Sequence, residues 1–250
     1  MNNIGKQTAV ALLLFVFSWA SYAQQLRFVT ENLPPFHFMG ADNKPAGALV
    51  EVIEALMIKT QLSAQIEFIP FARSYDLALN NKDIFMLSLM KSTDRKDLFQ
   101  WVGQIFKSKA FLVGLRSRSD INISNIEEAK SFVVGTIRGY HSEQHLKSAG
   151  FLEQKNLHLS VSYKHMWSML FEQRIDFILT NFVAVDREMK SIGFNKEDIK
   201  PFIELHDFPG DLFIATGLKT ADKTVTILSA ALQQIKADGT YKNIMDKWGL

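Results

Sequence analysis

The sequence contains no cysteine. The chain therefore forms no disulfide, offers no thiolate as a nucleophile or metal ligand, and has no cysteine to carry a lipid anchor. Its charge is also nearly balanced, with 28 lysines and arginines against 26 aspartates and glutamates. Proteins that bind nucleic acid neutralise phosphates with a basic surface, so this composition gives no reason to expect a nucleic-acid partner.

The common catalytic and phosphate-binding motifs are missing too. The chain has no Gly-x-Ser-x-Gly, no Walker loop and no dinucleotide fingerprint. His141 and His145 are four residues apart, a spacing that can chelate a metal, but no third ligand stands out near them. We therefore expect no cofactor and no metal, and the sequence gives enzyme chemistry no support of its own.

Long hydrophobic runs are also scarce, and the clearest one lies near the N-terminus. Lys6 precedes an apolar segment from Ala9 to Phe17, which is too short to span a bilayer, and Ser21-Tyr22-Ala23 follows it. These features predict a secretory signal peptide, residues 1–23, cut after Ala23. No later stretch approaches ~20 apolar residues. We expect the mature chain to be a soluble protein of a Gram-negative periplasm, without a membrane anchor.

Short apolar runs alternate with amphipathic segments along the mature chain. This alternation predicts an α/β fold in which helices flank a mainly parallel sheet. The predicted strands span residues 26–30, 66–69, 132–137, 157–161, 175–180 and 212–218, and the predicted helices span residues 49–57, 74–79, 141–148, 163–173, 223–237 and 240–248.

The most informative stretch runs from Asp83 to Trp101. Its apolar first half predicts a buried strand, and Ser88 to Arg95 then fall at the carboxyl end, where open α/β sheets hold ligands. Arginine is well shaped to bind a carboxylate through two parallel hydrogen bonds. The alternative is a surface arginine that opposes Asp94 or Asp97.

Several motifs follow one another in an order that carries a family resemblance. The motifs are Glu31-Asn32-Leu33-Pro34-Pro35-Phe36, Gly47 before a helix, Asn80-Asn81-Lys82-Asp83, Ser92-Thr93-Asp94-Arg95, Glu172-Gln173-Arg174-Ile175-Asp176, and Asp238-Gly239-Thr240-Tyr241 with Lys247-Trp248. In these motifs essentially all of the mature chain resembles the extracellular solute-binding proteins of family 3, the polar-amino-acid receptors of ABC importers.

The resemblance implies a fold that periodicity alone does not reveal. It implies the two-lobed type II periplasmic-binding-protein-like fold, in which each lobe is a sheet flanked by helices and two hinge crossings join the lobes. The first lobe would be discontinuous, residues 24–107 plus 210–250, and the second lobe would be residues 110–206. The ligand would be closed between the lobes by a hinge motion. The expected partners are a small-molecule ligand and an ABC permease, and the protein itself would be a monomer.

The resemblance also assigns site residues in the first lobe. Arg95 would bind the ligand carboxylate, and the Ser88 hydroxyl would help, although Ser88 could equally be a serine bonded within its own sheet. Met90 stands where the family usually has serine or threonine, so only its backbone N–H would serve an anion. Phe71 would be a pocket wall or an ordinary core residue. Arg73 would add a second positive charge or point to solvent.

In the second lobe, the segment from Gly135 to His141 predicts a strand that runs into a helix, whose start favours anions. The resemblance places Tyr140 and His141 at the pocket, although Tyr140 could instead support the turn. Asn181 stands where amino-acid receptors carry an aspartate for the ligand's α-ammonium. Asparagine cannot neutralise that charge. Either Glu31 supplies the carboxylate or the ligand has no amine, so an α-amino acid is no longer the default ligand.

The sequence thus predicts a periplasmic protein that captures a small carboxylate-bearing solute, an amino acid or a related anion, for an ABC importer. Two alternatives stay open. One is an enzyme on the same fold, similar to cyclohexadienyl dehydratase, with Glu31 and His141 as acid and base. The other is a sensory component that hands its closed form to a receptor or a signalling enzyme.

Overall fold

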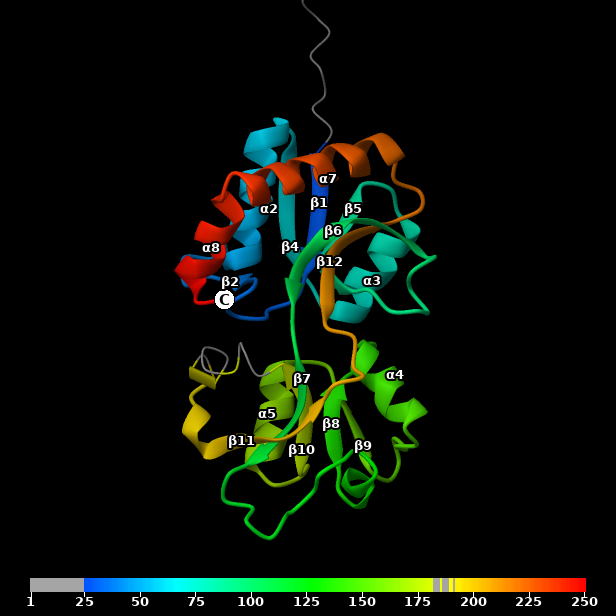
Figure 1. Ribbon diagram of the computed structural model, residues 1–250, viewed down its shortest axis with the longest axis vertical. Helices are drawn as coiled ribbons and strands as arrows, with labels where there is room; N and C mark the ends of the chain where they lie inside the picture. Colours follow the sequence, from blue (N-terminus) through cyan, green and yellow to red (C-terminus); the bar gives the residue numbers. More distant parts are fainter. Residues whose placement is uncertain (1–24, 182–184, 186–188, 191) are drawn as a thin grey trace, which may run out of the picture.

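The computed structural model describes residues 25–181, 185, 189–190 and 192–250. The predicted signal peptide lies outside these residues. Two five-stranded sheets, each with helices packed on it, follow one another along the long axis of the molecule (Figure 1). We call the parts built on these sheets the first and the second lobe. Within the described residues, no helix is both long and apolar enough to cross a membrane.

The first lobe contains the sheet with strand order β4-β1-β5-β12-β6. Strands β4, β1 and β5 are parallel, whereas β12 runs antiparallel to both β5 and β6. The elements of this lobe are β1 (Gln25–Thr30), β2 (Phe38–Met39), β3 (Pro45–Ala46), α2 (Ala48–Thr60), β4 (Ser63–Phe68), α3 (Phe71–Asn80), β5 (Ile84–Met90), β6 (Phe99–Lys107), β12 (Asp211–Gly217), α7 (Asp222–Ala237) and α8 (Thr240–Trp248).

The second lobe contains the sheet with strand order β11-β7-β10-β8-β9. Strands β10, β8 and β9 are parallel, and β7 runs antiparallel to β10 and β11. The elements of this lobe are β7 (Ala110–Leu115), the 3-10 helix η2 (Glu128–Ser131), β8 (Val134–Ile137), α4 (His141–Ser148), β9 (Leu157–Ser160), α5 (Tyr163–Phe171), β10 (Phe177–Asn181), the 3-10 helix η3 (Lys196–Asp198) and β11 (Ile199–Leu205).

Two connections join the lobes, from β6 to β7 and from β11 to β12 (Figure 1). They run close together: the Ser108 backbone N–H of the first connection donates to the Gly210 carbonyl of the second at 2.8 Å. The sheets are less parallel than the alternation of strands and helices predicts. The antiparallel pairings arise where one strand leaves a lobe and another returns to it. The residue boundaries proposed for the lobes, at 107/110 and 206/210, stay a prediction.

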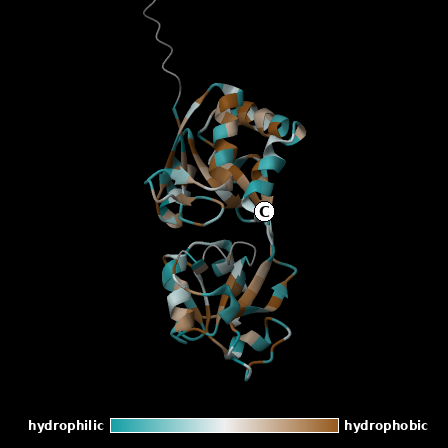
Figure 2. Cartoon of the chain, turned by 90° about the vertical axis from the view of Figure 1, so that its left-hand side faces the viewer, coloured by the Kyte–Doolittle hydropathy of each residue, from teal (hydrophilic) through white to brown (hydrophobic). Residues whose placement is uncertain are grey.

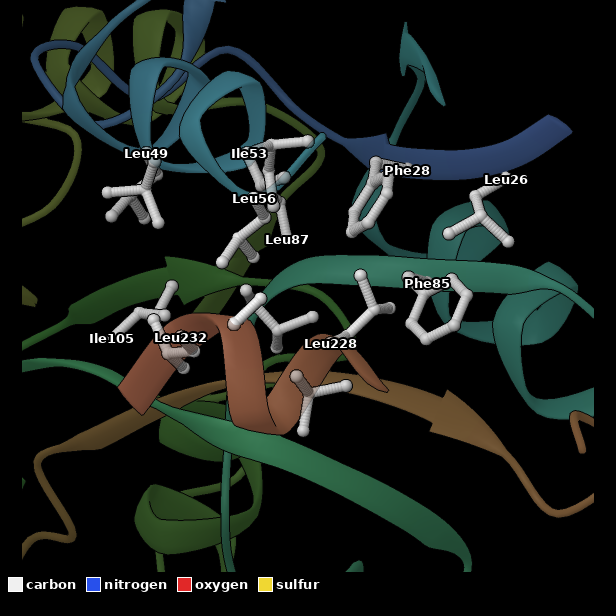
Figure 3. Close-up of a cluster of buried hydrophobic side chains, with 14 of the residues drawn as sticks. Leu26, Phe28, Leu49, Ile53, Leu56, Phe85, Leu87, Ile105, Leu228 and Leu232 are labelled. Carbon is white, nitrogen blue, oxygen red and sulfur yellow. The ribbon is translucent and has the colours of Figure 1, made fainter. Parts of the chain in front are cut away.

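The core of the first lobe lies between its sheet and helices α2 and α7. Leu49, Ile53 and Leu56 repeat at helical spacing on α2 and are at most 1% exposed. They meet Leu228 and Leu232 of α7 and the sheet residues drawn in Figure 3. Each such side chain contributes ~1.5–3 kcal/mol on burial, so the strands that carry the candidate site are rigidly held.

The second lobe has its own buried clusters, on both sides of its sheet. Trp167 of α5 is completely buried there, as is Phe177 at the start of β10. The strands inside both lobes are predominantly hydrophobic (Figure 2). Because each lobe buries its own core, the surface between them is free to be polar and to hold a solute.

Candidate functional site

A pocket lies where the two lobes face each other. It encloses about 100 Å³, which is room for a small solute and less than the usual pocket for a drug-sized molecule. Both lobes contribute side chains to it. The lining residues are Glu31, Leu33, Phe36, Phe71, Ser88, Met90, Arg95, Ser108, Lys109, Ala110, Tyr140, His141, Ser142, Tyr163, Leu179, Thr180, Asn181, Phe208 and Leu212.

The ends of buried strands position most of the polar side chains. Glu31 follows β1. Ser88 and Met90 lie in the last three residues of β5, the parallel neighbour of β1. Asn181 is the last residue of β10 in the other lobe, and Tyr140 and His141 come just after β8. Open α/β sheets bind ligands at such carboxyl ends. The pocket therefore gathers the residues that the sequence places at strand ends.

Arg95 is the buried cation of the pocket. Its side chain is almost enclosed, with the residue only 3% exposed, and burial lowers the pKa of its guanidinium. The guanidinium carbon lies 5.7 Å from the ring centre of Phe71 and 5.2 Å from that of Tyr75, within the range of cation–π attraction. Its Nη2 donates to the Gly139 carbonyl of the second lobe at 3.0 Å. This position does not match a solvent-exposed surface arginine.

Glu31 supplies a carboxyl group to the same pocket. Burial raises its pKa to about 7, and a hydrogen bond donated by the Tyr140 hydroxyl partly opposes this rise. The residue is accessible only in part, while its carboxyl group is surrounded by protein. Burial also raises the pKa of Tyr140 well above its usual value, so this hydroxyl stays a donor. The pair links the two lobes directly.

Aromatic rings form one wall of the pocket. Phe71 meets Tyr140 edge to face with ring centres 4.5 Å apart, and Tyr140 lies 6.0 Å from Tyr163. Phe71 is also part of the buried cluster under α3. The interpretations of Phe71 as a pocket wall and as a core residue are both consistent with its place, since it lines the pocket and also belongs to a buried cluster.

His37, which the sequence analysis missed, contacts the site through Ser88. It is 1% exposed, and its ring bridges three groups: Nδ1 lies 2.8 Å from the Glu31 carbonyl and 3.0 Å from Thr30 Oγ1, and Nε2 lies 2.9 Å from Ser88 Oγ. Burial lowers its pKa to about 4, so the ring is neutral at pH 7. Ser88 thus lines the pocket and is also bonded within the protein.

His141 and its neighbours line the other side. His141 Nδ1 is buried and lies 3.9 Å from Asp94 Oδ1, and burial lowers the pKa of His141. The ring of His145 packs against Phe208 with centres 5.2 Å apart. In the parts of the chain that the structure describes, no group of three or more His, Cys, Asp or Glu side chains could hold a metal ion.

Arg73 is the one proposed site residue that the structure leaves outside the pocket. It is exposed on the first turn of α3 and is not among the lining residues. The reason is helical geometry: residues two apart on a helix point in nearly opposite directions, so with Phe71 turned inward Arg73 points to solvent. Its interpretation as a second pocket cation is not supported.

Comparison with known proteins gives one family match over nearly all of the chain. Residues 26–250 match the family model described as bacterial extracellular solute-binding proteins, family 3. Among curated proteins, ABC transporter arginine-binding protein 1 of Escherichia coli (strain K12) is 24% identical over 263 residues, which cover 97% of this chain and 98% of the relative.

Solved structures agree on the fold. A histidine kinase sensor domain with similarity to periplasmic binding proteins gives a TM-score of 0.81 at 14% identity, over 90% of this chain and 96% of that chain. An ancestral amino acid-binding protein described as a precursor of cyclohexadienyl dehydratase gives a TM-score of 0.74 at 17% identity. The match covers 90% of this chain and 94% of that chain. The predicted two-lobed α/β fold class is confirmed.

The raised pKa of Glu31 predicts a pH effect on stability. The folded pKa of about 7 lies above the ordinary value of 4.5, so the unfolded chain loses this proton first as pH rises. The free energy of unfolding should then fall by roughly 3 kcal/mol from this group between pH 4.5 and 7, and stay level above that. Glu31→Gln should remove the loss and be more stable than the wild type at pH 8.

Urea unfolding at pH 5 and pH 8 measures this difference. The variant is needed because His37, whose folded pKa is lowered to about 4, adds stability as pH rises from 4 to 6.5 and masks the Glu31 effect in the wild type. Glu54→Gln, at an exposed position on α2, is the control. Equal stability of Glu31→Gln and wild type at pH 8 would contradict the prediction.

Proposed function

This chain belongs to the bacterial extracellular solute-binding proteins, family 3, and on that premise we propose that it captures an amino acid or a related small carboxylate between its lobes for an ABC importer. Arg95 carries the proposal. It is a buried guanidinium in a pocket lined by both lobes. Isolated charges are costly to bury, and a carboxylate matches the fork of arginine.

The charges of the pocket favour a ligand that carries a cation as well. Glu31 lies in the same pocket as Arg95, and a protonated carboxyl can become a carboxylate when a cation arrives. Asn181 lines the pocket without adding charge. An amino acid supplies a carboxylate for Arg95 and an ammonium or guanidinium for Glu31. The curated relative is named for arginine, which makes L-arginine the first candidate.

Capture would work by stabilising the closed arrangement of the lobes. Arg95 reaches the Gly139 carbonyl, and Tyr140 reaches Glu31, across the boundary between the lobes. A ligand that touches both lobes at once binds the closed form better than the open form. It therefore shifts the population toward the closed form by its difference in affinity. The importer would recognise that form.

We place the protein in the periplasm, as a monomer that meets a permease in the inner membrane. The family description supports an extracytoplasmic solute-binding role, and the predicted signal peptide supports export. We further propose that the chain is not an enzyme, because the family consists of solute-binding proteins. The sensory and enzymatic alternatives have weaker support. This chain shares only its fold with the corresponding solved structures, to which it is 14% and 17% identical.

A thermal-shift screen tests the proposed function. The panel comprises the common amino acids, including L-arginine, and small mono- and dicarboxylates without an amine. A ligand present at 100 times its dissociation constant adds about 2.7 kcal/mol of stability, which raises the melting temperature by several degrees. At least one amino acid should do so. A panel with no stabilising compound would contradict the proposal.

Arg95→Lys should abolish or greatly weaken binding while the protein stays folded. Lysine keeps the positive charge but loses the two parallel hydrogen bonds, and charge-assisted bonds of this kind contribute roughly 1.5–3 kcal/mol each. Affinity should fall at least about 10-fold in calorimetry with the ligand from the screen. Arg73→Lys makes the same exchange at an exposed position and should bind normally. Unchanged affinity in Arg95→Lys would remove Arg95 from the site.

The pH dependence of affinity reports whether the ligand carries a cation. If it does, binding needs ionised Glu31, whose pKa burial raises to about 7. Affinity should then fall about 10-fold from pH 8 to pH 6, with proton release on binding in the acidic range. Glu31→Gln should flatten this slope. An affinity that rises toward pH 6 would instead indicate an anion that accepts a hydrogen bond from protonated Glu31.

A further inference from the structure

The hydrogen bonds of His37 fix which of its ring nitrogens carries the proton. Nδ1 lies 2.8 Å from the Glu31 carbonyl oxygen, which can only accept. Nδ1 must therefore be an N–H donor, since an unprotonated Nδ1 would set two lone pairs against each other. Thr30 Oγ1, at 3.0 Å, shares this donor. The ring is buried, so water does not compete for these bonds.

A neutral ring with its proton on Nδ1 leaves Nε2 as an acceptor. Nε2 lies 2.9 Å from the hydroxyl oxygen of Ser88. A hydroxyl has one hydrogen, and in this contact the hydrogen of Ser88 must point at Nε2. Ser88 lines the pocket, and its hydroxyl oxygen then keeps only lone pairs for a ligand.

We propose that His37 holds Ser88 as a hydrogen-bond acceptor, so that Ser88 receives an N–H group of the ligand and does not donate to its carboxylate. This differs from the role that the sequence resemblance assigns to Ser88. It makes His37, which contacts Ser88 and is not among the lining residues, a positioning residue for ligand specificity. The proposal rests on the proposed function, because it names the chemistry of the same pocket.

The arrangement separates the pocket into two kinds of subsite. Arg95 can only donate, and it suits the carboxylate. Ser88 oxygen accepts, and one imidazole ties it to the backbone of Glu31, the residue that brings the pocket carboxyl group. A ligand whose ammonium faces Ser88 and Glu31 satisfies both. A carboxylate without an amine would leave the Ser88 lone pairs facing no donor, which disfavours it.

The first test needs no ligand. In the wild-type protein labelled with ¹⁵N-histidine, ring nitrogens with and without a proton have clearly different NMR shifts, and the spectrum of His37→Gln identifies the His37 signals by their loss. At pH 7 we expect a protonated Nδ1 and an unprotonated Nε2. A proton on Nε2 would overturn the proposal, because His37 would then donate to Ser88 and free its hydroxyl hydrogen.

The second test compares two probes on the same variant. L-arginine and 5-guanidinopentanoate differ only in the α-amine, and Ser88→Ala removes the proposed acceptor. The variant should bind L-arginine roughly 10- to 100-fold more weakly than the wild type does. Its affinity for the amine-free probe should change much less. A general distortion of the pocket would weaken both probes alike. Equal losses for both, or a larger loss for the amine-free probe, would overturn the proposal.

The two tests also separate this inference from the proposed function. If no amino acid or carboxylate binds the wild type, the proposed function fails, and the NMR experiment still decides how Ser88 is held. If L-arginine binds but its affinity is the same in Ser88→Ala, the proposed function stands and the acceptor role of Ser88 is wrong. Where another amino acid binds more tightly in the screen, that amino acid and its own amine-free analogue replace the arginine pair.

Discussion

The buried guanidinium of Arg95 is the constraint on which the rest of the site depends. A cation that is 3% exposed has given up nearly all of its hydration, and the protein returns only part of it. One carbonyl from the second lobe, two aromatic rings from the first lobe, the charge of Asp94 and a hydrogen bond with the Tyr75 side chain partly compensate. Because an isolated buried charge is expensive, the two lobes and any solute between them are arranged to supply what this cation lacks.

Burial acts in opposite directions on the pKa values of Glu31, which lines the same pocket, and of His37. It raises the pKa of Glu31 to about 7 and lowers that of His37 to about 4. Burial disfavours the charged form in both cases, so these two groups tend toward a neutral carboxyl and a neutral imidazole, while the pocket is also lined by Arg95 and Lys109. Glu31 can therefore ionise when a cationic group binds beside it, whereas the positive charge of Arg95 is permanent.

Local sequence patterns located the strand end that carries Arg95, and the family resemblance assigned most of the other site residues. Ser88, Met90, Arg95 and Asn181 come at or just after the ends of apolar runs, and these ends converge on one pocket. His37 was missed because its partners are set by the fold: Ser88 is 51 residues away in sequence. Arg73 was proposed because Phe71-Ala72-Arg73 resembles a subgroup of the family, but Arg73 is exposed on α3. The strands β6, β7 and β11 were not predicted, and the mixed direction of the sheets depends on long-range pairing that periodicity does not encode.

The strand order of the first lobe also determines when that lobe can be completed. Strand β12 lies between β5 and β6, and β6 has no other neighbour in its sheet. A chain that emerges from its N-terminus onward therefore exposes the edges of β5 and β6 until residues 211–217 arrive, long after the strands of the second lobe are available. The second lobe is built from one continuous segment and can form first. The first lobe closes its sheet only when its last strand is present, so its fold is completed after that of the second lobe.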